Sequence, residues 1–287
     1  GVILIETKSG KEGKTSVNYK FKIGKNFTRK GYEFVNAEDY IYYNRLGMLR
    51  TNQARDGRMG TYNVDAQAGY GVGNALYDIR YLTDETAHLQ NEGWSVMNDP
   101  YYDGKQILFR DYNGQLDDEV FSSSAITQDH YLNITGGNDK STFASSLGYY
   151  NEDGMIKGTG FKRFSGSFNG SYKIFPILNI KAGVSYVWST RPELWIGTYE
   201  FFYRTRSQRP TWNPWMEDGS PASGGGTGDG NPAYYRDLLT QKNSTARATY
   251  NIGFTLDIFP KELVLNGNAS LLNYQYPVSY THLRAHE

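Results

Sequence analysis

Residues 161–188 read FKRFSGSFNGSYKIFPILNIKAGVSYVW, and this stretch decides the fold. From Phe164 onward, every second residue is aromatic, aliphatic or glycine, and the residues between them are mostly polar. The pattern breaks at residues 175–177 and then resumes as far as Trp188. A period of two is the period of a β-strand, whose successive side chains point to opposite faces. The stretch therefore predicts two long strands, apolar on one face and polar on the other, joined by a very short turn.

The composition of the 287 residues favours a β protein. Tyrosine (25) and glycine (32) are abundant, and hydrophobic residues make up 38%, which is low for a packed soluble core. The formal net charge is zero, so no overall field attracts nucleic acid. Cysteine is absent, which excludes disulfides and thiolate metal sites. No run of about 18 apolar residues occurs, so the sequence predicts no transmembrane helix.

Similar alternation recurs along the chain and predicts about seven strands. They cover residues 14–23, 129–137, 141–150, 161–174, 178–188, 244–258 and 263–271. Their connections are alternately short and long, so the short turns and the long loops fall at opposite ends of the sheet. Two long regions, from Asn26 to about Gln128 and over 191–243, are expected to be largely irregular. Within the first, NAEDYIYYNRLGML predicts a short helix with Asn36 as its N-cap.

Alternating strands suit three architectures, and a transmembrane β-barrel fits best. In a soluble β-sandwich, strands usually run about 5–6 residues, which is shorter than those predicted here. A membrane barrel needs strands of about 9–11 residues, with short turns on one side and longer loops on the other. A β-solenoid, which ranks last, would need a fixed short repeat that is not visible. The aromatic residues that suit a membrane-interface girdle are Tyr149, Tyr150, Tyr186, Trp188, Tyr274 and Tyr276.

Three longer segments carry a resemblance to a known family. They are GVILIETKSGKEGK at 1–14, YEFVNAEDYIYYNRL at 32–46 and GGNDKSTFASSLGYYNEDGMIKGTGFKRFSGSFNGSYK at 136–173. In that order, they resemble the end of the plug domain, the helical segment of the first loop and the early barrel strands of SusC/RagA-type TonB-dependent outer-membrane transporters. The resemblance extends to about residue 190.

Pattern and resemblance together predict an all-β fold, in which about seven antiparallel strands form part of a larger transmembrane β-barrel with long extracellular loops. Residues 1–13 are then the end of the plug domain and its linker, and residues 14–277 are the N-terminal part of the barrel. The body of the plug and most of the barrel are expected to lie outside this chain. The tail 278–287, VSYTHLRAHE, resembles translated sequencing-adaptor sequence, and the alternative is an ordinary loop.

The same resemblance implies a function in the bacterial outer membrane. Such transporters import large nutrients with energy from the TonB system, and a SusD-like surface lipoprotein covers the barrel. The expected partners are therefore that lipoprotein, the TonB system through the plug, a glycan or peptide substrate, and outer-membrane lipid, but not nucleic acid. The alternative is a secreted, soluble β-sheet protein that acts as a carbohydrate-binding module or an enzyme.

The sequence shows no catalytic or metal-binding arrangement. Outside the tail, the histidines have no partner at ligand spacing. Neither a Ser–His–Asp set nor a carboxylate pair has local support. The carboxylate-rich segment at 111–119 lacks the full spacing of a calcium loop and is expected to be a turn, with adventitious calcium as a minor alternative. We therefore expect a protein that is not an enzyme and that needs no cofactor or metal.

One loop region has a composition that suggests ligand binding. Residues 191–243 combine many aromatic side chains with Arg204, Arg206 and Arg209. Aromatic rings in a long loop either pack among the loops or form a surface for sugar rings or peptide side chains, and both interpretations stay open. For the second interpretation, the candidate substrate-binding residues are Trp195, Tyr199, Trp212, Trp215, Tyr234 and Tyr235.

Overall fold

The structure is a computed structural model that describes residues 12–27, 33–54, 62–194, 196–224, 230–259 and 263–282. The chain divides into two compact units. The sheet unit comprises Gly1–Thr28, Ser122–Trp195 and Leu239–Glu287, and the loop unit comprises Arg29–Phe121 and Ile196–Leu238. Within the described ranges, no helix combines the length and the apolar character needed to cross a membrane.

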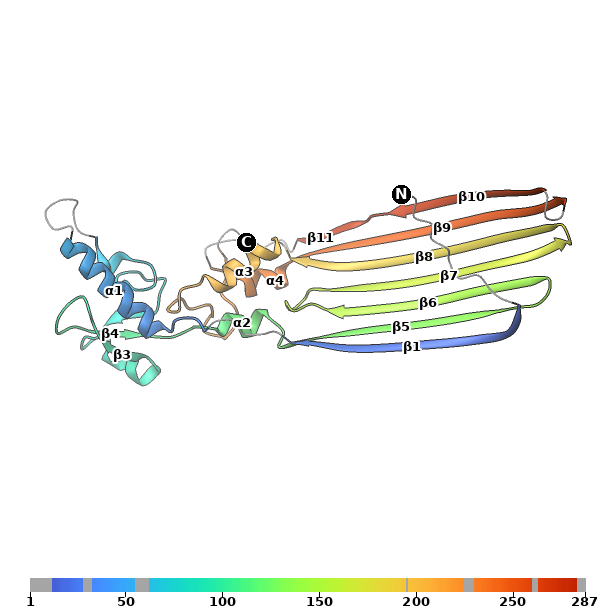
Figure 1. The fold of residues 1–287 in the computed structure, drawn as a ribbon. Coiled ribbons are helices and arrows are strands. Elements are labelled where there is room, and N and C mark those ends of the chain that lie inside the picture. Colours follow the sequence, from blue (N-terminus) through green and yellow to red (C-terminus); the bar gives the residue numbers. More distant parts are fainter. Residues whose placement is uncertain are drawn as a thin grey trace. The chain divides into compact units, whose positions relative to one another are not determined.

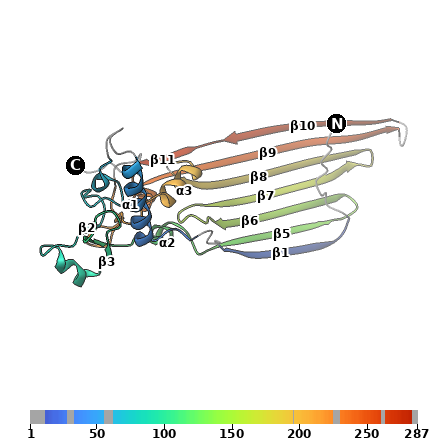
Figure 2. The same cartoon turned by 60° about the vertical axis from the view of Figure 1, so that its left-hand side comes forward.

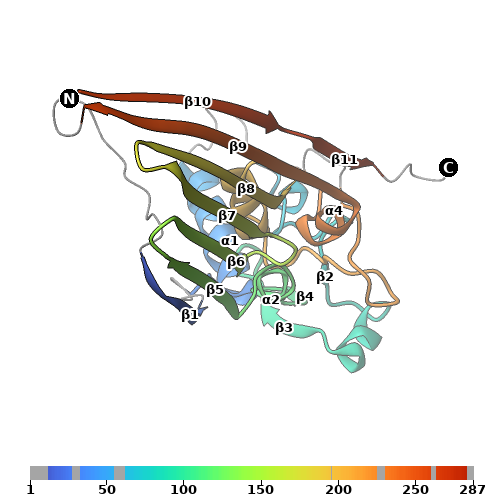
Figure 3. The same cartoon turned by 90° about the vertical axis from the view of Figure 1, so that its right-hand side faces the viewer.

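Seven long antiparallel strands lie side by side in one layer in the sheet unit (Figures 1, 2 and 3). Their bounds are β1 Gly13–Phe27, β5 Ser124–Gly137, β6 Ser141–Asp153, β7 Gly160–Phe175, β8 Leu178–Leu194, β9 Leu239–Phe259 and β10 Leu263–Gln275. They are hydrogen-bonded in the order β1-β5-β6-β7-β8-β9-β10. The predicted all-β, antiparallel class is therefore confirmed.

The C-terminal tail begins with a short strand. This strand, β11, spans Val278–His282 and pairs with β9. Residues 283–287, like most of the predicted plug segment 1–13, lie outside the described residues. The adaptor-like origin of the tail and the domain boundary at residue 13 stay predictions.

The register of the strands gives the sheet one apolar and one polar face. Residues directly opposite each other in an antiparallel pair lie on the same face, and the next row along points to the other face. One row across the seven strands is Val17, Ile134, Ser145, Phe168, Val184, Tyr250 and Leu271. The adjacent row is Asn18, Asn133, Ser146, Ser167, Ser185, Thr249 and Leu272. The alternation predicted strand by strand is therefore continuous across the whole sheet.

The two faces of the sheet are suited to different surroundings. On the apolar face, Phe168 and Ile252 are 49% and 59% exposed, because no second layer of described residues covers them. On the polar face, side-chain hydrogen bonds join neighbouring strands at Ser146–Ser167, Thr142–Ser171 and Ser189–Thr245, each 2.7 Å long. The sheet is thus built to contact an apolar medium on one side and polar groups on the other.

The predicted aromatic girdle is correct for only some of its residues. Tyr149 and Trp188 are both in register with Phe164 and lie on the apolar face. Tyr150 and Tyr274 lie opposite Arg163 and Arg247 instead, which places them on the polar face. The reason is geometric, because neighbours in one strand, such as Tyr149 and Tyr150, must point to opposite sides.

The connections between strands are short at one end of the sheet and long at the other, as predicted. The β5–β6 and β7–β8 turns lie at the same end (Figure 1). In the first turn, the Asn138 side chain accepts hydrogen bonds from the backbone N–H groups of Lys140 and Ser141 at 3.0 and 2.8 Å. The connections β1–β5, β6–β7 and β8–β9 leave the opposite end, and the first and last of these form the loop unit.

The prediction that the two long regions are irregular is wrong. They contain α1 Ala37–Ala54, β2 Ile79–Tyr81, β3 Ser95–Asn98, β4 Gln106–Phe109, α2 Gln115–Val120, α3 Thr198–Arg206, α4 Pro232–Leu238 and the short 3-10 helices Val64–Ala66 and Ala87–Glu92. Strands β2, β4 and β3 form a small antiparallel sheet in that order. Most of these elements are only 3–9 residues long, which is too short to display a hydrophobic period. The predicted helix is confirmed as α1, with the Asn36 side chain accepting the Asp39 N–H at 2.8 Å.

The opposite faces of β9 provide a matched pair of substitutions. We expect Phe254→Arg to impair assembly of the complete protein in the membrane, because an arginine on the lipid face is unfavourable, with a cost that reaches about 2–4 kcal/mol at the bilayer midplane. Asn251→Arg, three residues away on the polar face, should assemble at close to normal levels. Folded barrel in outer-membrane fractions, measured by heat-modifiable gel mobility, distinguishes the two. Equal loss in both variants would contradict the assignment of faces.

Candidate ligand-binding site in the loop unit

Two separate stretches of sequence pair directly to form the loop unit. The backbone N–H of Asp78 donates to the carbonyl of Thr211 at 2.8 Å, and the N–H of Tyr112 donates to the carbonyl of Pro210 at 2.7 Å. The buried hydroxyl of Thr211 donates to the carbonyl of Gly69 at 2.7 Å. The β8–β9 connection is therefore held along the β1–β5 connection by backbone contacts around residues 210–212.

A small apolar core lies beneath these contacts. It consists of Ala37 and Ile41 from α1, Ile79, Met97, Ile107 and Phe109 from the small sheet, and Tyr77 from the segment just before β2. Trp212 of the second loop packs against this core from a partly buried position. An isolated antiparallel β-bridge also joins the backbones of Trp212 and Tyr77. The core of the first loop is thus covered in part by a residue of the second loop.

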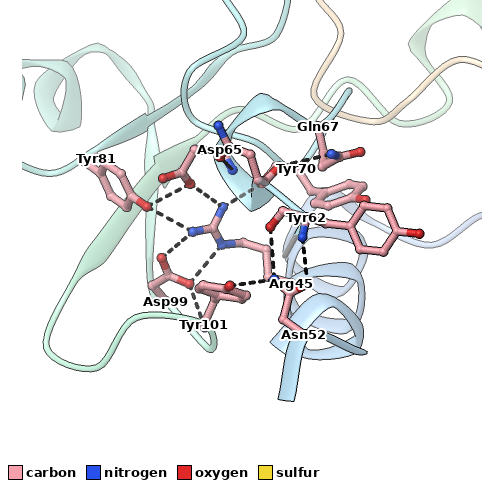
Figure 4. Close-up of polar contacts among 10 residues, drawn as sticks. Arg45, Asn52, Tyr62, Asp65, Gln67, Tyr70, Tyr81, Asp99 and Tyr101 are labelled. Carbon is pink, nitrogen blue, oxygen red and sulfur yellow. Dashed lines mark hydrogen bonds and ion pairs between the residues drawn. The ribbon is translucent and has the colours of Figure 1, made fainter. Parts of the chain in front are cut away.

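Arg45 of α1 is fully buried and makes the central polar contact of the loop unit (Figure 4). Its Nε and Nη2 donate to the two carboxylate oxygens of Asp99 at 2.9 and 2.5 Å. Its Nη1 donates to Asp65 at 3.1 Å and to the carbonyl of Tyr70 at 2.9 Å, and Nη2 also donates to the Tyr81 hydroxyl at 3.0 Å. All five N–H groups of the guanidinium therefore have partners, which is the condition for burying it.

The surroundings of Arg45 fix the charge states of the cluster. Burial disfavours the charged guanidinium, but the hydrogen bonds and the charge of Asp99 raise the pKa of Arg45 above its usual value. Burial and the hydrogen bond to Asp65 raise the pKa of the Tyr81 phenol. The cluster consequently holds a charged guanidinium beside a neutral phenol, and it connects α1 to the segments that carry Asp65 and Asp99.

Two cavities open beside this framework. The first, of about 210 Å³, is lined by Phe34, Val35, Tyr40, Tyr112, Asn113, Gly114, Leu116, Asp117, Thr205, Arg206, Gln208, Arg209, Pro210, Trp212 and Pro214. The second, of about 320 Å³, is lined by Leu76, Tyr77, Glu200, Tyr203, Arg204, Ser207, Gln208, Arg209 and Trp212. Gln208, Arg209 and Trp212 line both. We call the two together the arginine–tryptophan site.

Arg206 contributes to the walls of the first cavity and also joins the two loops. Its Nε lies 3.0 Å from Asp117 Oδ1 in an ion pair, and its guanidinium lies 5.3 Å from the ring centres of Phe34 and Phe121. Nearby, Arg236 contacts Glu119 at 3.2 Å. The carboxylates predicted to form a turn at 111–119 thus pair with arginines of the other loop.

The tyrosines of the first cavity stay uncharged at physiological pH. Burial raises the pKa of Tyr40, and the nearby positive charge of Arg209 opposes part of that rise. Burial and a short hydrogen bond of 2.5 Å to Asp78 raise the pKa of Tyr112 to about 12. Both side chains therefore offer neutral hydroxyls and apolar ring faces.

The five predicted substrate-binding residues that the structure describes are dispersed through the loop unit. Trp212 lines both cavities, whereas Trp215 donates from Nε1 to Gln115 at 2.8 Å. Tyr234 and Tyr235 of α4 contact each other edge to face, with ring centres 5.0 Å apart. Tyr199 on α3 is 82% exposed, and Trp195 lies outside the described residues.

Sequence reasoning missed the half of the site that comes from the first loop. Phe34, Tyr40 and Tyr112 lie roughly 100 to 180 positions before Trp212 in the chain, and no spacing rule connects them. The arginines of the second loop were visible as a basic cluster among aromatics. Among the described residues, no group of three His, Asp or Glu side chains converges in a way that could hold a metal ion.

A one-layer antiparallel sheet with one apolar face and long loops at one end is the wall of a membrane barrel. Comparison with known proteins agrees with this class, although no family model matches the chain. The chain is 25% identical over 171 residues to the TonB-dependent receptor SusC of Bacteroides thetaiotaomicron, and the match covers 59% of this chain and 12% of that receptor.

Solved structures of a peptide transporter have the same fold. The structure of the RagAB peptide transporter matches with a TM-score of 0.61 at 16% identity, covering 96% of this chain and 30% of the other. The 'closed-closed' state of the RagAB peptide importer matches with a TM-score of 0.59 at 17% identity, covering 96% of this chain and 30% of the other. The 'open-open' state matches with a TM-score of 0.59 at 18% identity, covering 96% of this chain and 29% of the other.

The chain thus resembles part of a SusC/RagA-type TonB-dependent transporter, a class of the bacterial outer membrane, and the predicted resemblance and location are borne out. It spans about an eighth of the curated receptor and under a third of the solved chains.

Arg45 allows a test of how the loop unit is held together. We expect Arg45→Met to destabilise this unit by about 3–5 kcal/mol, because it leaves the buried Asp99 carboxylate without its partner. The double variant Arg45→Met/Asp99→Leu should lose less, and Arg50→Met on an exposed part of α1 should stay within about 0.5 kcal/mol. Hydrogen exchange of α1 and β3 amides in the complete protein measures each effect. A single variant no less protected than the double variant would contradict this account.

Substitutions at Trp212 and Tyr199 test whether Trp212 supports the packing of the loop unit. We expect Trp212→Ala to reduce the protease resistance of the loop unit, since removing a partly buried indole costs about 2–3 kcal/mol, less than a fully buried one. Tyr199→Ala, at an 82% exposed position, should leave protease resistance unchanged. Limited proteolysis of the complete protein, with surface abundance measured in parallel, makes the comparison. Equal sensitivity of both variants would show that Trp212 does not support the core.

Proposed function

We propose that the complete protein imports a large nutrient, a glycan or an oligopeptide, across the bacterial outer membrane with energy from the TonB system. The observation that carries this proposal is the predominantly apolar face that extends across seven paired strands. Lipid requires every backbone polar group to be paired within the protein, and laterally hydrogen-bonded strands meet that requirement. The names of the matched proteins, a TonB-dependent receptor and a peptide transporter, support the same activity.

The proposal includes the partners that this activity needs. A SusD-like surface lipoprotein would cover the outer end of the barrel, and the TonB system would act through a plug domain. Outer-membrane lipid would contact the apolar face. The long connections, which leave one end of the sheet, would form the surface that first meets the substrate.

The alternative, a secreted soluble β-sheet module or enzyme, has less support. A soluble sandwich covers its apolar face with a second sheet. Here Ile252 and Phe254 remain 59% and 41% exposed on that face. The matched proteins are named as a receptor and a transporter rather than as enzymes.

Uptake by the complete gene product tests the proposal. In the native host, we expect deletion of the gene to abolish growth on at least one glycan or oligopeptide mixture, and deletion of tonB to do the same because energy no longer reaches the barrel. Deleting a neighbouring SusD-like lipoprotein gene should reduce uptake of the same nutrient. Uptake measured with labelled nutrient gives the readout. Transport that persists without TonB, or a protein found in the soluble fraction, would reject the proposal.

A further inference from the structure

Three arginines on and just after α3 differ in how they are neutralised. Arg204 pairs with Glu200 at 2.9 Å, and Arg206 pairs with Asp117 at 3.0 Å. Arg209 is exposed and has no carboxylate within ion-pair distance in the parts of the chain that the structure describes. The arginine–tryptophan site therefore retains one positive charge that no described residue compensates.

Arg209 lies where the two cavities meet. Its side chain runs close to Gly69, whose φ of +82° is strained for other residues, and a Cβ on Gly69 would come within 2.8 Å of the Arg209 Cβ and Cγ. Its positive charge acts on Tyr40, and Trp212 lines the same two cavities. Arg209 thus shares the first cavity with the Tyr40 phenol, to which it is hydrogen-bonded, and with the Trp212 indole.

We propose that Arg209 binds a carboxylate of the imported ligand, while the group that bears the carboxylate stacks against Trp212. This inference rests on the proposed function, because it takes the ligand to be a piece of a peptide or glycan. A guanidinium binds a planar carboxylate through two parallel hydrogen bonds, and an indole face packs well against a sugar ring or an apolar side chain. The carboxylate can belong to an acidic peptide or to a uronic acid.

The charges around Arg209 make the site selective for anionic ligands. Because Glu200 and Asp117 are each matched by an arginine, the net charge of the site is that of Arg209 alone. A neutral ligand of the same shape would displace water from Arg209 without replacing its hydrogen bonds, and such a loss disfavours binding. The raised pKa values of Tyr40 and Tyr112 mean that neither phenol competes as an anion.

Binding to the purified complete transporter in detergent tests this inference. The probes are two fluorescent peptides, one of alternating leucine and glutamate and one with glutamine in place of glutamate, and two oligosaccharides, oligogalacturonate and neutral galactan. We expect the wild type to bind at least one acidic probe about tenfold or more tightly than its neutral counterpart, as a charged hydrogen-bonded pair allows. Arg209→Gln should abolish that preference, and Arg209→Lys should retain part of it.

Matched controls keep the outcome interpretable. Arg50→Gln removes an exposed arginine of the same unit that lines neither cavity, and it should leave the preference unchanged. Surface abundance and protease resistance of Arg209→Gln should match the wild type, since this exposed side chain forms no ion pair with the residues of the unit that the structure describes. The acidic probe that is preferred then identifies the source of the carboxylate as peptide or uronate.

Two results would overturn the inference. One is equal affinity of the wild type for acidic and neutral members of both probe pairs, and the other is a preference that survives in Arg209→Gln. TonB-dependent growth of the Arg209→Gln strain on a neutral nutrient distinguishes this failure from failure of the proposed function. If growth persists while selectivity is unaffected, only the carboxylate site is wrong, whereas loss of TonB dependence in the wild type rejects the transporter itself.

Discussion

A sheet that is one layer thick has no interior, and this constraint governs the sheet unit. Each strand must satisfy its backbone through the neighbours on its two sides, while each face must match whatever medium lies beyond it. Val17 and Leu271, at the two ends of one row, obey the same rule as Val184 in the middle. A shift of one residue in any strand would move its apolar side chains among the polar ones, so a medium that is apolar on one side fixes the register of all seven strands. The long strands, the strict alternation and the short turns all follow from that requirement.

This constraint also explains which parts of the structure the sequence reveals. A strand between lipid and a polar interior shows its two faces in its own residues, so the seven strands, their order and the faces of Phe254 and Asn251 were predictable. Their ends were not, because β9 begins at Leu239 in a polar segment that shows no alternation. The loop unit was missed for a different reason. Arg45 and Asp99 are 54 residues apart, and nothing in either local sequence indicates that they meet.

Buried and partly buried ion pairs specify how the two loops of the loop unit are joined. Arg45 joins α1 to Asp99 and Asp65, and Arg236 and Arg206 join the second loop to carboxylates of the first. Buried ion pairs add little net stability, but removing one partner is strongly unfavourable, so they specify one arrangement of the chain over others. Two loops that enter from different strands need that kind of specificity, since apolar contacts are non-directional and do not by themselves select one packing over another.

The same contacts that join the loops also prepare Arg209 for binding. Arg206 is held between Asp117 and two aromatic rings, and the carbonyl of Pro210 accepts the backbone N–H of Tyr112. The backbone that carries Arg209 is therefore fixed on both sides, although the side chain itself is exposed. A cation presented from a fixed backbone loses less conformational freedom when it binds a carboxylate than one on a flexible loop. Because Arg204 and Arg206 are already neutralised, a single positive charge is left at this position, and the ligand is selected by the one arginine of the three that forms no ion pair with the described residues.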